Sequence, residues 1–207
     1  MYKKFILILS FLTFSISYGQ YDWTPGKLVL KNGQTLKGLI KLPSGSNSFI
    51  SMGKSKLQFK KNKKSSKKKF GETQVNKVFF FGISNSEIGY YEYVAISRKR
   101  KALFKLIING KAKLYTRTVR VTTNIGFQDK DNLYGQSRYA EVKEFYVIRE
   151  RETVATRLIG SKSLNSFKQH ALNYFSDCKD LSSYISDDLY EEYDIRELIN
   201  DYNILCN

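Results

Sequence analysis

The sequence contains very little histidine, tryptophan, proline and methionine. Its 207 residues include one His, one Trp, two Pro and two Met. With His170 as the only histidine, in a segment of helical periodicity, and with no Gly-x-Ser-x-Gly motif, Ser-His-Asp catalysis has no basis. We therefore predict neither a cofactor nor a metal ion, and an enzyme is not the first expectation.

Long apolar runs are absent except at the N-terminus. Lys3 and Lys4 precede a mainly apolar run of 12 residues, which Ser17, Tyr18 and Gly19 follow. This order is typical of a signal peptide, and the run is shorter than the ~20 residues that a membrane-spanning helix needs. We predict that residues 1–19 are a cleaved signal peptide and that no transmembrane span remains afterwards. The expected location is the periplasm, the outer membrane or the medium; an uncleaved anchor or a buried strand is the alternative.

Cysteine is scarce as well, and the two cysteines are Cys178 and Cys206. In an oxidising compartment an even number of cysteines favours a disulfide. The alternative, a metal site, lacks both a Cys-x-x-Cys spacing and a supply of histidine ligands. The bridge would close a loop of about 29 residues, for which the chain-entropy model gives roughly 3–4 kcal/mol of stabilisation.

Acidic residues are few and unevenly distributed. There are 35 Lys and Arg residues against 19 Asp and Glu residues, and without residues 1–19 the net charge is +14, from 33 basic and 19 acidic residues. Residues 178–207 contain eight acidic and two basic residues, a balance of −6, so the rest of the mature chain carries about +20. This asymmetry concerns electrostatic fields and partners rather than the fold.

Hydrophobic periodicity predicts a chain that begins with strands. Apolar and polar residues alternate over 27–42 around Asn32-Gly33, which predicts a hairpin with a type I′ turn, and Asn109-Gly110 predicts a second hairpin. A long polar loop is expected over 123–137. The further predicted strands are 48–52, 56–60, 74–81, 90–97, 139–150 and 153–159.

The period changes to that of helices after Gly160. Ser163 is a candidate cap for a first helix, Leu181 lies in a second, and Asp194 with Glu197 predicts a capping box for a third. The predicted fold class is therefore α+β: a mainly antiparallel β sheet or barrel-like meander, followed by a small C-terminal helical segment stapled by the disulfide. We place a β-rich basic domain at 20–160 and an acidic helical segment at 161–207.

A lysine-rich segment reads KKNKKSSKKK over 60–69, and nine lysines lie between positions 54 and 69 without an acidic residue. Such a run predicts a solvated loop between strands. It is either a solubilising tip or a docking site for a polyanion, that is, an anionic membrane surface or envelope polymer. Lysine in place of arginine argues against nucleic acid. The candidate anion-binding residues are Lys60, Lys61, Lys63, Lys64, Lys67, Lys68 and Lys69.

A second basic cluster comprises Arg98, Lys99, Arg100 and Lys101 at a predicted turn. Three tyrosines precede it and could form a basic and aromatic binding surface with it. The alternative is that they are core residues or cross-strand pairs. They are Tyr90, Tyr91 and Tyr93.

Carboxylates show no catalytic pattern along the chain. The pairs at 187–188 and 191–192 lie in an acidic, exposed stretch, where an ordinary pKa makes a poor general acid at neutral pH. Asp129 and Asp131 resemble part of a calcium loop, but Leu133 breaks its frame. The sequence does not exclude that the fold brings two distant carboxylates together across a cleft, so an envelope-polymer hydrolase is the alternative function.

Both ends of the chain resemble one group of proteins. The hairpin Asn-Gly-x-Thr-Leu-x-Gly at 32–38 and the segments Tyr-Phe-x-Asp-Cys at 174–178 and Tyr-Asn-x-x-Cys at 202–206 are similar to those of uncharacterised exported proteins from Bacteroidota-type bacteria. Lys179 stands where such relatives often have proline. The resemblance implies export, an envelope setting and a cysteine pair, but no activity.

The expected function is that of an exported, non-catalytic envelope protein whose basic body contacts an anionic partner. The opposite charges also allow the acidic tail to mask part of the basic surface of its own chain. The sequence sets no oligomeric state.

Overall fold

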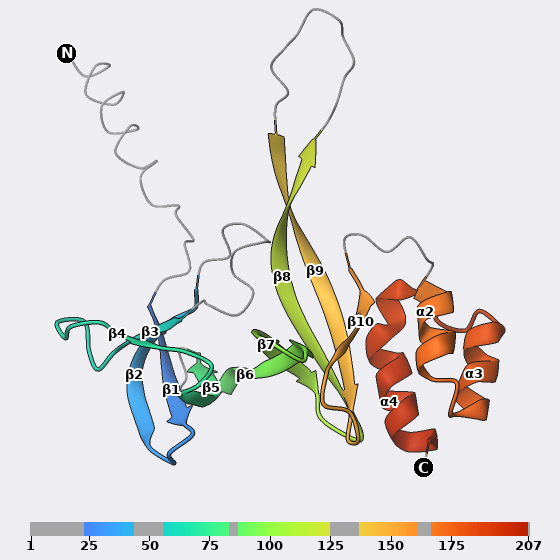
Figure 1. Ribbon diagram of the computed structural model, residues 1–207, viewed down its shortest axis with the longest axis horizontal. Coiled ribbons are helices and arrows are strands. Elements are labelled where there is room, and N and C mark those ends of the chain that lie inside the picture. The colour runs from blue at the N-terminus through green and yellow to red at the C-terminus, as the bar shows by residue number, and fades with distance from the viewer. Residues whose placement is uncertain (1–22, 44–55, 83–86, 125–136, 161–166, 207) are drawn as a thin grey trace, which may run out of the picture.

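The computed structural model describes residues 23–43, 56–82, 87–124, 137–160 and 167–206 (Figure 1). Outside these ranges lie the predicted signal peptide, the predicted strand 48–52, the candidate cap Ser163, the predicted calcium-like residues and most of the predicted loop 123–137.

Ten strands of the described chain form one antiparallel sheet, and a C-terminal helical segment follows, as predicted. Most of the predicted strands are present within a few residues of their expected ends. The strands are β1 (Thr24–Leu30), β2 (Thr35–Lys41), β3 (Leu57–Lys60), β4 (Lys68–Phe70), β5 (Val75–Phe81), β6 (Glu87–Ser97), β7 (Arg100–Ile108), β8 (Ala112–Asn124), β9 (Ser137–Arg149) and β10 (Thr156–Ile159). The helices are α2 (Phe167–Tyr174), α3 (Lys179–Ser186) and α4 (Ile195–Leu205), with a 3₁₀ turn η2 (Glu192–Asp194) before α4.

The strand order is β10-β9-β8-β7-β6-β5-β1-β2-β3-β4. The chain therefore meanders from β5 to β10, whereas β1 pairs with both β2 and β5 and places the first hairpin inside the sheet. The described ladder ends at β4 and at β10. Between these edges the Ala155 N–H donates to the Ala95 carbonyl across 2.8 Å, which links the β9–β10 connection to β6 and curls this part of the sheet.

The first hairpin turn differs from the predicted type I′. The Gly33 N–H donates to the Leu30 carbonyl at 3.0 Å, and the Leu30 N–H donates to the Gln34 carbonyl at 2.8 Å. Gly33 has φ +86°, but Asn32 does not have a positive φ. The loop therefore has three residues, and the glycine occupies the left-handed position. The Asn32 side chain accepts the Gln34 N–H at 3.0 Å, which stabilises this alternative.

Three clusters of buried side chains stabilise the sheet and the helices. The first lies on one face of β1–β5 and includes Leu28, Ile40 and Val78. The second fills the space between the sheet and the helices. The third, around Phe104, Tyr115 and Tyr146, lies within the curled part of β6–β9. The apolar alternation along each strand explains why one face of the sheet is buried at each place.

The helix α4 begins where predicted, but its cap is different. Asp194 occupies the N-cap position without a side-chain hydrogen bond to the helix. Its carboxylate instead accepts the Glu191 N–H at 3.0 Å, so the capping box lies one turn earlier and closes η2. Asp194 therefore caps the 3₁₀ turn, and Glu197 is simply an acidic residue of the first turn of α4.

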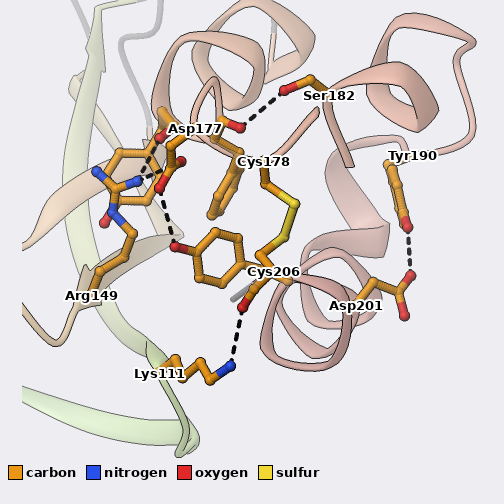
Figure 2. Close-up of a disulfide and its surroundings, with 11 residues drawn as sticks. Lys111, Arg149, Asp177, Cys178, Ser182, Tyr190, Asp201 and Cys206 are labelled. Carbon is orange, nitrogen blue, oxygen red and sulfur yellow. Dashed lines mark hydrogen bonds and ion pairs between the residues drawn. A yellow bond between two sulfur atoms is a disulfide. The ribbon is translucent and has the colours of Figure 1, made fainter. Parts of the chain in front are cut away.

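The predicted disulfide between Cys178 and Cys206 is present (Figure 2). Cys178 lies immediately before α3 and Cys206 immediately after α4, with their Cα atoms 5.6 Å apart. The Lys111 ammonium donates to the Cys206 carbonyl at 3.2 Å, so the bridge also lies against the start of β8.

An arginine attaches the helical segment to β9. The Arg149 guanidinium forms ion pairs with Glu152 and Asp177, each at 2.8 Å, and lies 4.5 Å from the centre of the Tyr174 ring. Burial opposes ionisation of Glu152, but hydrogen bonds from Tyr174 and Arg149 hold its pKa below the usual range. Its contribution to stability is therefore present above the ordinary carboxyl pKa and is lost as the pH falls through the folded value.

A second attachment joins α4 to the end of the β7–β8 turn. The Asn203 amide accepts the Ala112 N–H at 2.7 Å and donates to the Ala112 carbonyl at 3.0 Å. A Cβ atom at Gly110 would lie 2.6 Å from the Asn203 Cγ, so this glycine makes room for the amide. The Asn109-Gly110 turn thus depends on glycine for space and not for a positive φ.

Replacing Asn203 by alanine is expected to lower the free energy of unfolding by about 1–3 kcal/mol, because the buried N–H and carbonyl of Ala112 lose their partner. Urea unfolding followed by circular dichroism measures this loss. Asn200→Ala, on the exposed side of the same helix, is the matched control and should change stability by less than about 0.5 kcal/mol. Equal effects of the two substitutions would contradict the assigned role.

Candidate anion-binding site

The lysine-rich segment forms a hairpin of β3 and β4 at one edge of the sheet. Its tip is a hydrogen-bonded turn in which the Asn62 side chain accepts the N–H groups of Lys64 and Ser65, each at 3.0 Å. Buried Leu57, Phe59 and Phe70 hold the two strands. We call the segment's lysines the lysine hairpin: Lys60, Lys61, Lys63, Lys64, Lys67, Lys68 and Lys69.

The prediction of a loop up to residue 69 was therefore wrong at its C-terminal end. Lys60 ends β3, in agreement with the predicted strand 56–60, but Lys68 and Lys69 belong to β4. Phe59 and Phe70 are buried, whereas Lys68 and Lys69 beside them are exposed, so strand structure extends into the charged run.

The second basic cluster, residues 98–101, lies at the β6–β7 turn and is exposed, as the predicted turn implies. The three tyrosines do not form one surface with each other. Tyr91 and Tyr93 pack against the first core cluster, whereas Tyr90 lies on the opposite face of the sheet. Burial, together with the Glu72 carboxylate, raises the pKa of Tyr93 to about 12. The core interpretation of Tyr91 and Tyr93 is therefore the better one.

A cationic surface that the sequence did not reveal lies on the face of the sheet opposite the first core. Lys37 in β2 is directly opposite Lys27 in β1. Lys27 is in turn opposite Phe79 in β5, and Phe79 is opposite Tyr90 in β6. One row across four strands therefore reads lysine, lysine, phenylalanine, tyrosine.

Aromatic rings hold the ammonium groups of this surface in place. The Nζ of Lys27 lies 4.3 Å from the centre of the Phe79 ring, and that of Lys77 lies 5.5 Å from the centre of the Tyr90 ring. Lys60 extends the surface to β3, with its Nζ 4.7 Å from the centre of the Trp23 ring. Cation–π contacts of this kind stabilise a lysine by about 0.5–1 kcal/mol at exposed sites. We call this surface the cationic face: Lys27, Lys37, Lys60 and Lys77, with Trp23, Phe79 and Tyr90.

The cationic face continues into a network of carboxylates and tyrosines. Glu92, opposite Lys77, accepts a hydrogen bond from Tyr90 at 2.7 Å and another from Tyr115. Burial and the Glu92 carboxylate raise the pKa of Tyr115 well above its usual range. The Tyr115 hydroxyl therefore stays protonated and keeps donating at any pH near neutral.

Glu144 in β9 is buried, at 4% exposure, and no other charged residue is buried among those whose side chains the structure describes. Its carboxylate pairs with Arg117 at 2.7 Å and with Arg157 at 3.1 Å, and it accepts a hydrogen bond from Tyr146 at 3.2 Å. The Arg117 guanidinium lies against the adjacent rings of Phe104 and Tyr146, at 5.2 and 5.3 Å from their centres. Every carboxylate oxygen thus has a partner, and the arrangement favours a structural role over general acid catalysis.

The two ends of the molecule carry opposite charge. Residues 23–43 and 56–82, which contain β1–β5, include 13 lysines and one acidic residue, a net charge of +12. Residues 167–206 include nine acidic and three basic residues, a net charge of −6. The helices contact β7, β8 and β10 and lie at the far end of the long axis from β3 and β4 (Figure 1). The acidic tail therefore does not mask the lysine hairpin of its own chain.

Within the described residues, no helix combines the length and the apolar character needed to cross a membrane. The same part of the chain holds no group of three or more potential metal ligands. Comparisons with protein-family models, curated proteins and solved structures find no significant match. The resemblance of both chain ends to exported proteins therefore stays a prediction.

Whether the sequence indicates the pairing of Lys27 with Lys37 depends on the type of turn assumed at Asn32-Gly33. Pairing across a two-residue turn at Asn32-Gly33 would place Lys27 opposite Gly38. The observed three-residue loop shifts the register by one residue and places Lys27 opposite Lys37. A shift of one residue moves a side chain to the other face of the sheet relative to its neighbours, so the face could be found only with the correct turn.

Proposed function

We propose that this protein is an exported, non-catalytic protein of the cell envelope that binds an anionic polymer through its cationic face and lysine hairpin. The observation that carries the proposal is the direct pairing of Lys27 with Lys37. Like charges directly opposite each other on neighbouring strands destabilise a sheet. A bound anion would neutralise this repulsion, so the arrangement is favourable when the ligand is present.

The aromatic rings support binding because they orient lysines before the ligand arrives. A free lysine side chain loses up to about 2 kcal/mol of conformational entropy when it is immobilised, whereas Lys27 and Lys77 already lie over rings. Less entropy is then lost when the anion binds. These two lysines should therefore contribute more per residue than the exposed lysines of the hairpin tip.

The distribution of charge favours an extended ligand over a small one. The basic residues of β1–β5 are all lysines and span five strands from the β3–β4 edge inward. A lysine ammonium is a point charge and does not select the planar geometry of one base or phosphate. Repeated carboxylate, phosphate or sulfate groups along a polymer match such a surface. The disulfide agrees with an oxidising compartment outside the cytoplasm.

The test uses residues 20–207 and measures affinity for an acidic polysaccharide, lipopolysaccharide and DNA over a salt series. Lys27→Gln with Lys37→Gln should weaken binding at ~0.1 M salt by at least about tenfold. The slope of log affinity against log salt should fall by about two, since each lost contact removes about one released counterion. A hairpin variant with Lys61, Lys63, Lys64 and Lys67 replaced by serine should show a further reduction in slope.

The matched control removes the same charge at the β6–β7 turn, with Lys99→Gln and Lys101→Gln, and should retain most of the affinity. The double substitution removes the repulsion between Lys27 and Lys37 but also the contact of Lys27 with Phe79, two effects of similar size, so stability should change by less than about 0.5 kcal/mol. Weaker binding in a protein of essentially unchanged stability would separate ligand contact from misfolding. Equal losses in the control, or no binding at low salt, would contradict the proposal.

A further inference from the structure

Among the residues whose side chains the structure describes, the exposed large apolar ones all lie in the helical segment. They are Tyr184, Leu189, Tyr193, Ile204 and Leu205. Leu189 is 61% exposed and Tyr193 is 76% exposed, so neither side chain is packed into the core of this chain. Three of the five, Tyr184, Leu189 and Tyr193, belong to α3 and the connection that leads to α4.

The end of α3 brings Tyr184 and Leu189 together. The Leu189 N–H donates to the Tyr184 carbonyl at 3.1 Å, and the Asp188 N–H donates to the Ile185 carbonyl at 3.3 Å. This is a Schellman motif, in which the residues equivalent to Tyr184 and Leu189 commonly touch. Asp188 occupies the left-handed position with φ +59°, and its carboxylate pairs with Lys168 at 2.6 Å. The exposed Leu189 is therefore held by a defined turn.

Carboxylates surround these apolar side chains. Asp187 and Asp188 precede Leu189, and the exposed Tyr193 lies between Glu192 and Asp194. We call the whole surface the acidic face: Tyr184, Asp187, Asp188, Leu189, Glu191, Glu192, Tyr193 and Asp194. It presents an open aromatic ring and several carboxylates, which are the two groups that attract a lysine ammonium.

The lysine hairpin has the complementary chemistry, and the same chain cannot bring the two surfaces together. The structure already pairs three lysines with aromatic rings, at distances of 4.3 to 5.5 Å from Nζ to ring centre. Only one acidic residue accompanies the 13 lysines of the basic end. The acidic face lies with the helices at the opposite end of the long axis (Figure 1).

From this complementarity we infer that the acidic face of one copy binds the lysine hairpin of a second copy, head to tail. Such a contact uses two different surfaces, so it leaves one free surface of each kind and continues into a ring or an open chain. A polyanion bound at the hairpin would compete with the acidic face and release the copies from one another. The inference does not rest on the proposed function, because it requires no polymer.

Sedimentation velocity on residues 20–207 tests the inference. At ~0.05 M salt the mean mass should rise with protein concentration beyond that of a dimer, and at ~0.5 M salt the protein should sediment as a monomer, since screening weakens exposed charge contacts. One variant removes the acidic face with Leu189→Ser, Glu191→Ser, Glu192→Ser and Tyr193→Ser. A second removes the hairpin charge with Lys61→Ser, Lys63→Ser, Lys64→Ser and Lys67→Ser.

Each variant alone should be monomeric at low salt, because each lacks one of the two surfaces. An equimolar mixture should form a dimer and nothing larger, since it contains only one intact pair of surfaces. Circular dichroism and thermal unfolding check that both variants are folded. Wild type that stays monomeric at low salt, either variant associating like wild type, or a mixture that stays monomeric while wild type associates would each overturn the inference.

The outcomes separate this inference from the proposed function. The acidic-face variant keeps the cationic face and should bind the acidic polysaccharide as wild type does. If it binds polymer and wild type does not associate, the inference fails and the proposed function stands. If wild type associates but binds none of the polymers, the proposed function fails and the head-to-tail contact stands.

Discussion

Glu144→Ala is expected to lower the free energy of unfolding by about 3–5 kcal/mol, a large fraction of the stability of a domain of this size. Glu144 is buried, forms ion pairs with Arg117 and Arg157, and accepts a hydrogen bond from Tyr146. Its removal leaves the Arg117 guanidinium, at 16% side-chain exposure, against two aromatic rings and without this counter-ion. The cost comes mainly from the uncompensated charge and less from the lost attraction.

Chemical denaturation of the purified variant, followed by circular dichroism, measures this effect. Glu141→Ala is the control, because Glu141 is an exposed residue of the same strand and should matter far less. Glu144→Leu combined with Arg117→Met removes both charges and keeps apolar volume, so it should be less damaging than Glu144→Ala alone. A loss below about 1 kcal/mol for Glu144→Ala would contradict the structural role.

Removal of the disulfide by Cys178→Ser and Cys206→Ser is expected to cost about 3–4 kcal/mol, the chain-entropy value for a loop of this length. The bridge joins residues 28 apart and closes the segment that contains α3 and α4. Without it, the unfolded chain gains conformations that the bridge excludes. The added freedom affects the helical segment first, because the sheet has its own core clusters.

Hydrogen exchange locates the effect along the chain. Amide protection in α3 and α4 should fall strongly, whereas protection in β1, β2 and β5 should change little, since these strands share a separate core. Treatment of wild type with a reductant should reproduce the serine variant, and the same treatment of the variant should have no effect. A uniform loss of protection across the sheet would show that the bridge stabilises the whole chain as one unit.

Several elements could be predicted because their signals are local. Alternating apolar residues and Asn-Gly pairs predicted both hairpins, and the change of period after Gly160 predicted the helices. The two cysteines predicted the bridge because no other pairing existed. The helix α4 was predicted in place, but its capping box was assigned one turn too late, since the sequence alone does not show which backbone N–H a carboxylate will accept.

The candidate site was found only in part. The lysine hairpin stands out as a charged run, and its exposure follows from charge alone. The cationic face does not stand out in the sequence, because Lys27, Phe79 and Tyr90 are separated along the chain. They become neighbours only because β1 pairs with β5 and β5 pairs with β6. The grouping of Tyr90 with Tyr91 and Tyr93 was wrong because neighbouring residues of a strand point to opposite faces.

The sequence by itself determined the element types, the alternation of buried and exposed positions, the cysteine pair and the opposite charge of the two ends. These depend on residues close in the chain or on composition. Only the tertiary structure decided the strand order, the register across the first turn, the burial of Glu144 and the separation of the charged ends. The physical reason is that pairing energies between distant strands decide which side chains meet. The three-residue turn at Gly33 shifts the β1–β2 register by one residue. This shift places Lys27 opposite Lys37, whereas a two-residue turn would have placed it opposite Gly38.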